Sequence, residues 1–198
     1  MIQFFPLLTE AGIAYTHHAV YSDRFFRIQN GIVKKSPLAK KISFVVGMLA
    51  GFAKKAAYVF SAGWYDAVLI QREVFPKIWY WLMRRINPRI IYEIEDTIFE
   101  VNPFWRRGAL HEAALRYQAV MCLNMMRHAS HVIVENEYIA AEARKHNRSV
   151  SLLTAPINAD VFRPRTRRPH WPIVIGWIGS PSTSHMLKNL EPVFQEVG

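Results

Sequence analysis

Residues 89–99 read RIIYEIEDTIF, and this stretch decides the fold. Its apolar start, residues 90–92, is short, β-branched and aromatic, which is typical of a buried strand. Three carboxylates follow it, Glu93, Glu95 and Asp96. Carboxylates at the end of a buried strand cost free energy unless they face a cleft or a partner. In open α/β sheets ligands bind outside the carboxyl ends of the strands, so we expect these acids to line a ligand cleft.

The composition is that of a globular protein. The chain has 198 residues, of which 51% are hydrophobic, enough for one full domain and part of a second. A single cysteine, Cys122, excludes a disulfide framework and a cysteine-rich metal site, and it favours a reducing compartment. The net charge of +10 favours an anionic partner, namely nucleic acid, anionic lipid or a phosphorylated substrate, with a solvated basic surface as the alternative.

No targeting signal is apparent at the start of the chain, which lacks a basic region and a small-residue cleavage site. The longest apolar run, residues 42–53, is shorter than the ~20 residues that a membrane-spanning helix needs.

Strand and helix patterns alternate along the chain. The predicted strands are residues 13–20, 65–71, the acidic stretch, 132–134 and 150–153, and the predicted helices are 2–11, 37–61, 76–86, 109–129 and 138–146. The helix at 109–129 is apolar nearly all round, so we expect it to be mostly buried. Short connections between such elements predict an α/β fold, a Rossmann-like parallel sheet with helices on both faces. Because a helix precedes the first strand, we expect a first strand to be missing from the N-terminus.

The second half of the chain indicates a domain boundary. Residues 161–172 are rich in proline and arginine and predict a linker. Residues 1–160 then form the N-terminal domain. A strand at 173–178 and a helix at 185–197 form one β-loop-α unit, which we expect to be the start of a second, incomplete domain.

The polar strand ends are the candidate substrate site. Arg72 and Glu73 follow one strand, Glu95 and Asp96 the next, and Asn136 the one after, so parallel strands bring all five to one edge of the sheet. A carboxylate there could accept a proton from an acceptor hydroxyl or bind its hydroxyls, and Arg72 could bind phosphate or carboxylate. The alternatives are salt bridges among these residues, helix capping, and a pair of carboxylates that hydrolyses sugars.

Gly179 and Ser180 are the candidate phosphate-binding residues of the second domain. A glycine after a strand allows close approach of the backbone, and the following helix offers free N–H groups to an anion. The alternative for Ser180 is an N-cap. The sequence holds no HExxH, CxxC, GxSxG, GxGxxG or Walker motif, and no metal site is expected.

The helix at 37–61 has two predicted environments. Lys40, Lys41, Lys54 and Lys55 flank its apolar middle, a pattern that suits an anionic membrane surface. The alternative is a helix packed on the sheet with its lysine side chains extended to water.

Five blocks of sequence, the last of them in two parts, together resemble successive blocks of bacterial group 1, family 4-like, glycosyltransferases. They are YDAVLIQRE (65–73), RIIYEIEDTIFE (89–100), ASHVIVENEYIAAEA (129–143), SLLTAPINADVFRP (151–164), IVIGWIGSPST (173–183) and LKNLEPVF (187–194). They cover most of residues 65–194 in order, whereas residues 1–64 resemble the acceptor-side region of that family only loosely.

The resemblance implies a GT-B fold, in which an N-terminal domain binds the acceptor and a C-terminal domain binds a nucleotide-sugar. It implies a hexosyltransferase that needs neither metal nor another cofactor, retains anomeric configuration and acts on a sugar or lipid-linked acceptor. Its setting would be cell-envelope or surface polysaccharide or glycolipid synthesis, in the cytoplasm or at the inner face of the membrane. Glu95-Asp96, Asn136 and Gly179-Ser180 match motif positions of the family.

One departure from the family pattern matters. The donor-binding Glu-x7-Glu region of the family lies further along the C-terminal domain than Gly198, so the resemblance implies that this chain alone has no transferase activity. The alternative function is a non-enzymatic basic module that binds nucleic acid or an anionic membrane. No helix-turn-helix, RNP or zinc signature supports nucleic acid, which is not expected as a partner.

Overall fold

The computed structural model describes residues 5–29, 31–101, 108–154, 157, 159, 161–164, 174–179 and 184–197. The chain divides into two compact units, Met1–Ile157 (unit 1) and Asn158–Gly198 (unit 2). Most of the predicted linker at 161–172 lies outside the described residues.

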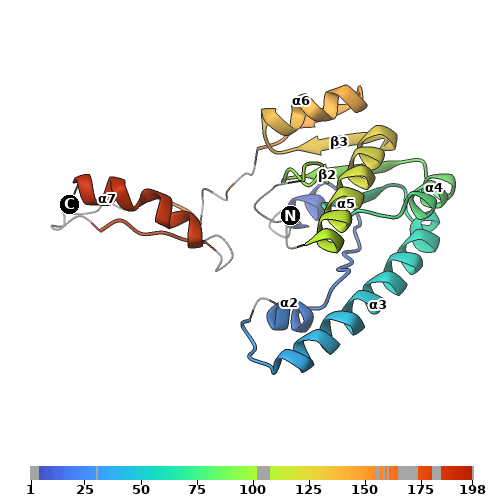
Figure 1. Ribbon diagram of the computed structural model, residues 1–198. Helices are drawn as coiled ribbons and strands as arrows, with labels where there is room; N and C mark the ends of the chain where they lie inside the picture. Colours follow the sequence, from blue (N-terminus) through green and yellow to red (C-terminus); the bar gives the residue numbers. More distant parts are fainter. Residues whose placement is uncertain are drawn as a thin grey trace. The chain divides into compact units, whose positions relative to one another are not determined.

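Unit 1 alternates helices with strands, and Figure 1 labels most of them. In chain order its elements are α1 (Phe5–Glu10), α2 (Asp23–Gln29), α3 (Pro37–Ser61), the short 3-10 helix η2 (Ala62–Trp64), β1 (Val68–Gln71), α4 (Lys77–Ile86), β2 (Ile90–Ile94), α5 (Ala109–His128), β3 (His131–Val134), α6 (Glu137–His146) and β4 (Val150–Leu152). Unit 2 holds the 3-10 helix η4 (Ser184–Leu190) and α7 (Glu191–Val197).

The four strands form one parallel sheet in the order β1-β2-β3-β4. Ile70 pairs with Tyr92, Tyr92 with Val132, and Val132 with Val150, so these residues form one row across the sheet. The predicted α/β fold with a parallel sheet is therefore confirmed. Right-handed crossovers between strands in this sequential order place their helices on the same face of the sheet.

The hydrophobic core lies on the Tyr92 face of the sheet. Helices α4, α5 and α6 all contribute to one buried cluster with the strands, through side chains such as Met83, Met125 and Ile139. Tyr92 Oη donates to Cys122 Sγ at 3.6 Å within this cluster. Burial raises the pKa of the Cys122 thiol to about 11, so the single cysteine is a protonated core residue at neutral pH.

The opposite face of the sheet is less covered. Leu69, Ile91, Glu93 and Ile133 alternate with the buried residues, and none of them is buried. Among the described residues, the connecting helices α4, α5 and α6 pack on the Tyr92 face, and helices on the other face stay a prediction.

At the start of the chain, the predicted end of the first helix is confirmed and the predicted strand after it is wrong. The first helix ends as expected, with Gly12 in the left-handed region at φ +73°. Residues 13–20 form no strand, and the helix α2 was not predicted. A strand needs a hydrogen-bonded neighbour, and this segment is held by side chains instead, because Lys54 Nζ and Tyr58 Oη both donate to the Ala19 carbonyl.

Helix α3 has the predicted bounds, whereas α5 is less buried than expected. Pro37 occupies the first turn of α3, and the Ser36 hydroxyl accepts from the Ala39 N–H at 3.3 Å. The prediction that α5 is buried over most of its length is wrong for its first half, where Leu110 and Tyr117 are exposed. Apolar composition alone cannot place a helix inside a core when no neighbouring element covers it.

In unit 2 the predicted β-loop-α unit lacks its strand. Residues 174–179 are exposed and form no strand, so the prediction of a strand at 173–178 is wrong for its described part. A lone strand has no partner for its backbone groups, which explains the difference. The predicted helix at 185–197 is present as η4 followed by α7.

A buried asparagine between α4 and β2 binds the chain to η2. Asn87 Nδ2 donates to the carbonyls of Ala62 at 3.0 Å and Tyr65 at 2.8 Å, and its Oδ1 accepts from the Arg89 N–H at 2.9 Å. Asn147, which lies between α6 and β4, makes the matching set: its Nδ2 donates to the carbonyls of Met126 and Ala129 at the end of α5, and its Oδ1 accepts from the Ser149 N–H. In both places the side-chain amide satisfies backbone groups that the helix and the strand leave unpaired.

We predict that Asn87→Ala lowers the free energy of unfolding by about 2–3 kcal/mol, because it removes hydrogen bonds at a buried position worth about 1 kcal/mol each. Urea denaturation followed by circular dichroism measures the change. Asn189→Ala, at an exposed position in η4, is the control. A loss for Asn87→Ala no larger than that of the control would contradict this role.

Candidate functional site

The carboxyl ends of β1 and β2 bring Arg72 and Asp96 together. Gln71 pairs with Glu93 in the sheet, and the Arg72 N–H donates to the Glu93 carbonyl at 2.8 Å, which extends the pairing by one residue. Arg72 Nη2 then lies 2.8 Å from Asp96 Oδ2. Both side chains are more than half exposed, so the ion pair itself contributes at most about 1 kcal/mol and remains open to a ligand.

The backbone of Arg72 is strained. Its φ is +61°, in the left-handed region that a non-glycine residue adopts at a cost of roughly 1–2 kcal/mol. Among the described residues it is the one non-glycine residue with a positive φ. A strained arginine beside carboxylates at a strand end is the kind of position where binding residues are found.

Glu73 has a structural partner at the same edge. Its Oε2 lies 2.7 Å from Lys55 Nζ, which also donates to the Val74 carbonyl at 2.9 Å and lies 5.5 Å from the Phe75 ring centroid. These contacts attach α3 to the end of β1. The predicted substrate-binding role of Glu73 therefore competes with a role in packing.

Among the acidic residues at the carboxyl ends of β1 and β2, Glu93 has the most unusual environment. Its Oε1 accepts from Gln71 Nε2 at 3.4 Å, whereas its Oε2 is buried and has no hydrogen-bond partner among the described residues. Burial raises the pKa of the Glu93 carboxyl, and repulsion by Glu95 and Glu135 raises it further. The predicted catalytic residues Glu95 and Asp96 are exposed beside it.

Asn136 lies at the end of β3 and caps the next helix. Its Oδ1 accepts from the Ile139 N–H at 2.9 Å, so the side-chain oxygen serves α6. Helix capping was the alternative for these polar strand ends, and it describes Asn136. Its predicted role in substrate binding has no separate support in the geometry.

The predicted phosphate-binding pair belongs to unit 2. Gly179 is exposed, and a Cβ atom placed there would lie 2.1 Å from Cζ2 of the Trp177 indole, so another residue would require that exposed ring to move. Ser180 lies outside the described residues. Within the part of the chain that the structure describes, no group of three or more His, Cys, Asp or Glu side chains is arranged to hold a metal ion.

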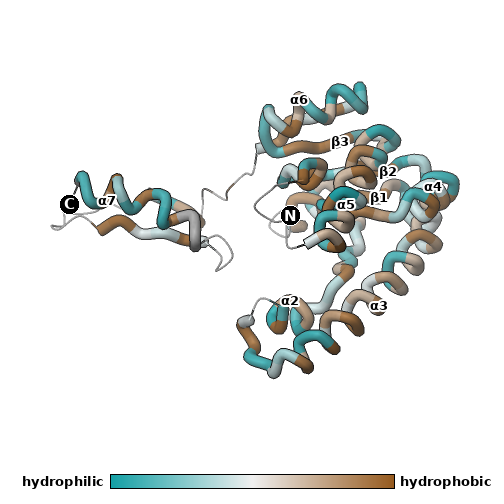
Figure 2. The backbone as a smooth tube through the Cα atoms, in the orientation of Figure 1, coloured by the Kyte–Doolittle hydropathy of each residue, from teal (hydrophilic) through white to brown (hydrophobic). Residues whose placement is uncertain are grey.

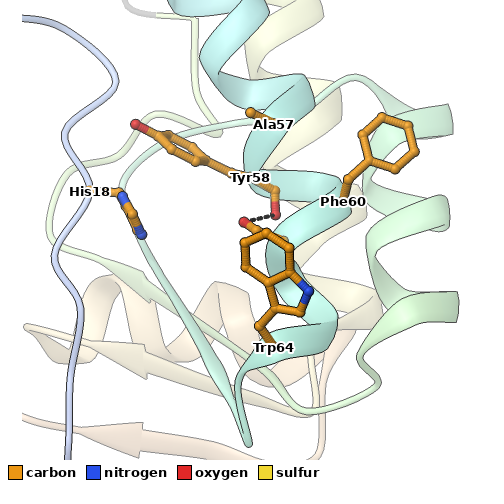
Figure 3. Close-up of a pocket in the computed structure, with 6 residues that line it drawn as sticks. His18, Ala57, Tyr58, Phe60 and Trp64 are labelled. Carbon is orange, nitrogen blue, oxygen red and sulfur yellow. Dashed lines mark hydrogen bonds between the residues drawn. The ribbon is translucent and has the colours of Figure 1, made fainter.

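An apolar depression of about 400 Å³ lies elsewhere in unit 1, at the C-terminal end of α3 (Figure 3). It is lined by His18, Ala57, Tyr58, Phe60, Ser61 and Trp64. Trp64 precedes β1, whereas Arg72 follows it, and no predicted site residue lines the depression. The depression is therefore a different place from the carboxyl ends of β1 and β2, where Arg72 and Asp96 lie.

Comparison of the chain with protein-family models, with curated proteins and with solved structures finds no match. The glycosyltransferase prediction therefore rests on the sequence blocks and on the arrangement at the strand ends.

We predict that Glu93→Gln stabilises unit 1 at pH 7 relative to wild type, and that the difference disappears near pH 4. Because the folded state raises the pKa of Glu93 above its ordinary 4.5, the fold favours the protonated carboxyl, and stability is lost as the pH rises through the folded pKa. Glutamine cannot ionise and avoids that loss. Urea midpoints measured between pH 4 and pH 8, with Glu10→Gln as the exposed control, test this. A difference between Glu93→Gln and wild type that does not change with pH would refute it.

We also predict that Arg72→Gly is more stable than Arg72→Ala by about 1 kcal/mol, because both variants lose the ion pair with Asp96 and only glycine relieves the positive φ. Chemical denaturation of the two variants side by side measures the difference. Equal stabilities would show that Arg72 carries no backbone strain.

Proposed function

We propose that this chain supplies the acceptor-binding part of a glycosyltransferase that moves a sugar from a nucleotide-sugar to a sugar or lipid-linked acceptor. The reaction would belong to cell-envelope or surface polysaccharide or glycolipid synthesis. The observation that carries the proposal is the gathering of Arg72, Glu93, Glu95 and Asp96 at the carboxyl ends of two adjacent parallel strands. This edge is where open parallel sheets bind ligands.

The chemistry of these side chains suits a polyhydroxylated acceptor. Exposed carboxylates such as Glu95 and Asp96 accept hydrogen bonds from sugar hydroxyls, and one of them can take the proton of the attacking hydroxyl. Arg72, already paired with Asp96, orients that carboxylate and adds donors for a phosphate or carboxylate on the acceptor. Glu93, with its raised pKa, is suited to hold a proton close to the same edge.

The donor side is assigned to Gly179 and Ser180 by the sequence resemblance alone. The Glu-x7-Glu region expected for the donor is not among the 198 residues, so we expect this chain to bind an acceptor and to turn over no nucleotide-sugar by itself. No metal or other cofactor is expected in the reaction, and no nucleic acid partner.

Two other functions make different predictions. A basic binding module, suggested by the net charge of +10, would bind duplex DNA with an affinity that falls steeply with salt. A sugar hydrolase, suggested by the neighbouring carboxylates, would release free sugar without a nucleotide donor.

We predict that the chain binds oligosaccharides or lipid-linked sugar head groups, and that Glu95→Gln combined with Asp96→Asn weakens binding roughly tenfold or more, since hydrogen bonds to charged groups contribute about 1.5–3 kcal/mol. Saturation-transfer NMR with a panel of acceptors measures this. Glu137→Gln, which removes an exposed acid of α6 that pairs with Arg144, is the matched control.

Three outcomes would contradict the proposal. One is salt-dependent binding of duplex DNA with no binding of any sugar, and another is equal weakening by the control substitution. The third is release of free sugar from an acceptor in the absence of a nucleotide-sugar. Turnover of a nucleotide-sugar by the chain alone would refute the narrower expectation that this chain is inactive by itself.

A further inference from the structure

The segment that contains most of α2 and all of α3 carries only basic charges. Residues 24–65 include eight lysines and arginines and no aspartate or glutamate. The basic residues are Arg24, Arg27, Lys34, Lys35, Lys40, Lys41, Lys54 and Lys55. A charge distribution of this kind favours an anionic surface as partner.

One side of α3 is covered by the chain that precedes it. The Phe25 ring lies so close to Gly47 that an added Cβ would come within 2.1 Å of it, and the Tyr21 ring approaches Gly51 in the same way at 2.8 Å. Tyr21 Oη also donates to Met48 Sδ at 3.6 Å. Figure 1 shows α2 beside the N-terminal half of α3, in agreement with these contacts.

The side of α3 that α2 leaves uncovered carries an exposed apolar stripe. Its residues are spaced alternately four and three apart, which places them on one face of the helix. The stripe consists of Leu38, Ile42, Val45, Leu49 and Phe52, each more than half exposed. Figure 2 shows the hydrophobic residues along α3. Such a continuous exposed apolar surface marks an interaction site.

We propose that this stripe binds an anionic lipid membrane, with α3 lying in the plane of the head groups. The apolar stripe would enter the boundary of the acyl chains, and Lys34, Lys35 and Lys41 near the start of the helix would contact lipid phosphates. A large apolar face with lysines at its margin is the pattern of helices that lie in a membrane surface.

The helix lies on the membrane and does not cross it. By length and composition α3 with η2 (Pro37–Trp64) could span a bilayer. Lys54 and Lys55 are bound to the Ala19 carbonyl and to Glu73, and Val59 belongs to the core, so the C-terminal part of α3 is held in the fold. The charge-free part, residues 42–53, is ~18 Å long at 1.5 Å per residue, less than the ~30 Å of a hydrocarbon core.

Charge disfavours a second copy of the chain as the occupant of the stripe. The 4-3 spacing is also that of coiled coils, whose flanking positions commonly carry pairs of glutamate and lysine. Because residues 24–65 hold only basic charges, two paired α3 helices would bring like charges together. An anionic lipid surface neutralises the same charges.

Membrane binding is independent of the proposed function, because it requires no sugar. The two proposals are linked only through Lys55 and Glu73, which attach α3 to the strand end that also carries Arg72. A chain that binds vesicles but no acceptor would therefore fail the first proposal and keep this one.

Co-sedimentation of the full chain with vesicles tests the proposal. We predict binding to phosphatidylcholine vesicles that contain phosphatidylglycerol and much weaker binding to phosphatidylcholine alone. Leu49→Glu should weaken binding about tenfold or more, because it removes an apolar side chain that would enter the membrane and adds a negative charge. Ala50→Glu adds the same charge at an exposed position outside the stripe and should weaken binding much less.

The electrostatic part has its own matched pair of variants. Lys34→Gln with Lys35→Gln should reduce binding roughly tenfold or more, since each lysine near an anionic surface contributes about 1 kcal/mol. Arg127→Gln with Arg148→Gln removes two exposed charges from α5 and the loop before β4 and should leave vesicle binding nearly unchanged.

A labelled variant keeps the proposal testable if Leu49→Glu fails to fold. Val45→Cys carrying an environment-sensitive dye should shift to the blue with anionic vesicles, and the native Cys122 is buried and should not react with the dye. No vesicle binding by the folded wild type, equal binding by wild type and Leu49→Glu, or a wild-type dimer in solution that Leu49→Glu dissociates would each overturn the proposal.

Discussion

The backbone pairing of β1 with β2 is the constraint on which the candidate site depends. Because the two strands are parallel and in register from Val68 and Ile90 onward, their carboxyl ends stop side by side. The last bond of that pairing, from the Arg72 N–H to the Glu93 carbonyl, holds Arg72 in its positive φ and leaves its guanidinium beside Asp96. The same pairing gives Glu93 its partly buried position on the less covered face of the sheet.

The core on the Tyr92 face holds that pairing in place. Side chains of three helices bury the alternate residues of the strands, and Asn87 and Asn147 connect helix ends to strand starts. The polar edge itself contributes little to stability, since its ion pair is exposed and its arginine is strained. The strained backbone of Arg72 and the buried Glu93 Oε2, which has no hydrogen-bond partner among the described residues, persist only where the surrounding structure is rigid enough to impose them.

Elements with strong local patterns could be predicted from the sequence, and those that depend on a partner could not. The strands after Ala67 and Arg89 and the bounds of α3 follow from apolar runs, Pro37 and the breakers between them. The strands expected at 13–20 and 173–178 are absent from the described residues, because apolar alternation does not say whether a neighbouring strand exists. The seven residues of α2 were not predicted as a helix because so short a segment shows no clear apolar periodicity.

At the candidate site the sequence predicted the meeting of Arg72 with Asp96 and missed the importance of Glu93. Parallel topology is enough to bring strand ends together, whereas the burial of one carboxylate depends on which face the helices cover. The alternation of side chains along β2 already contained a signal. Glu93 lies two residues from both Ile91 and Glu95, which places it on the face of the sheet opposite Tyr92. The capping role of Asn136 was likewise open until Ile139 was seen to donate to it.

The most direct test of the central claim is an amide NMR titration of the full chain with an acceptor oligosaccharide. If the strand-end edge binds the acceptor, the largest shifts will map to Arg72, residues 93–96 and residues 135–136. Shifts confined to α3, or to the depression beside Trp64, would contradict the account.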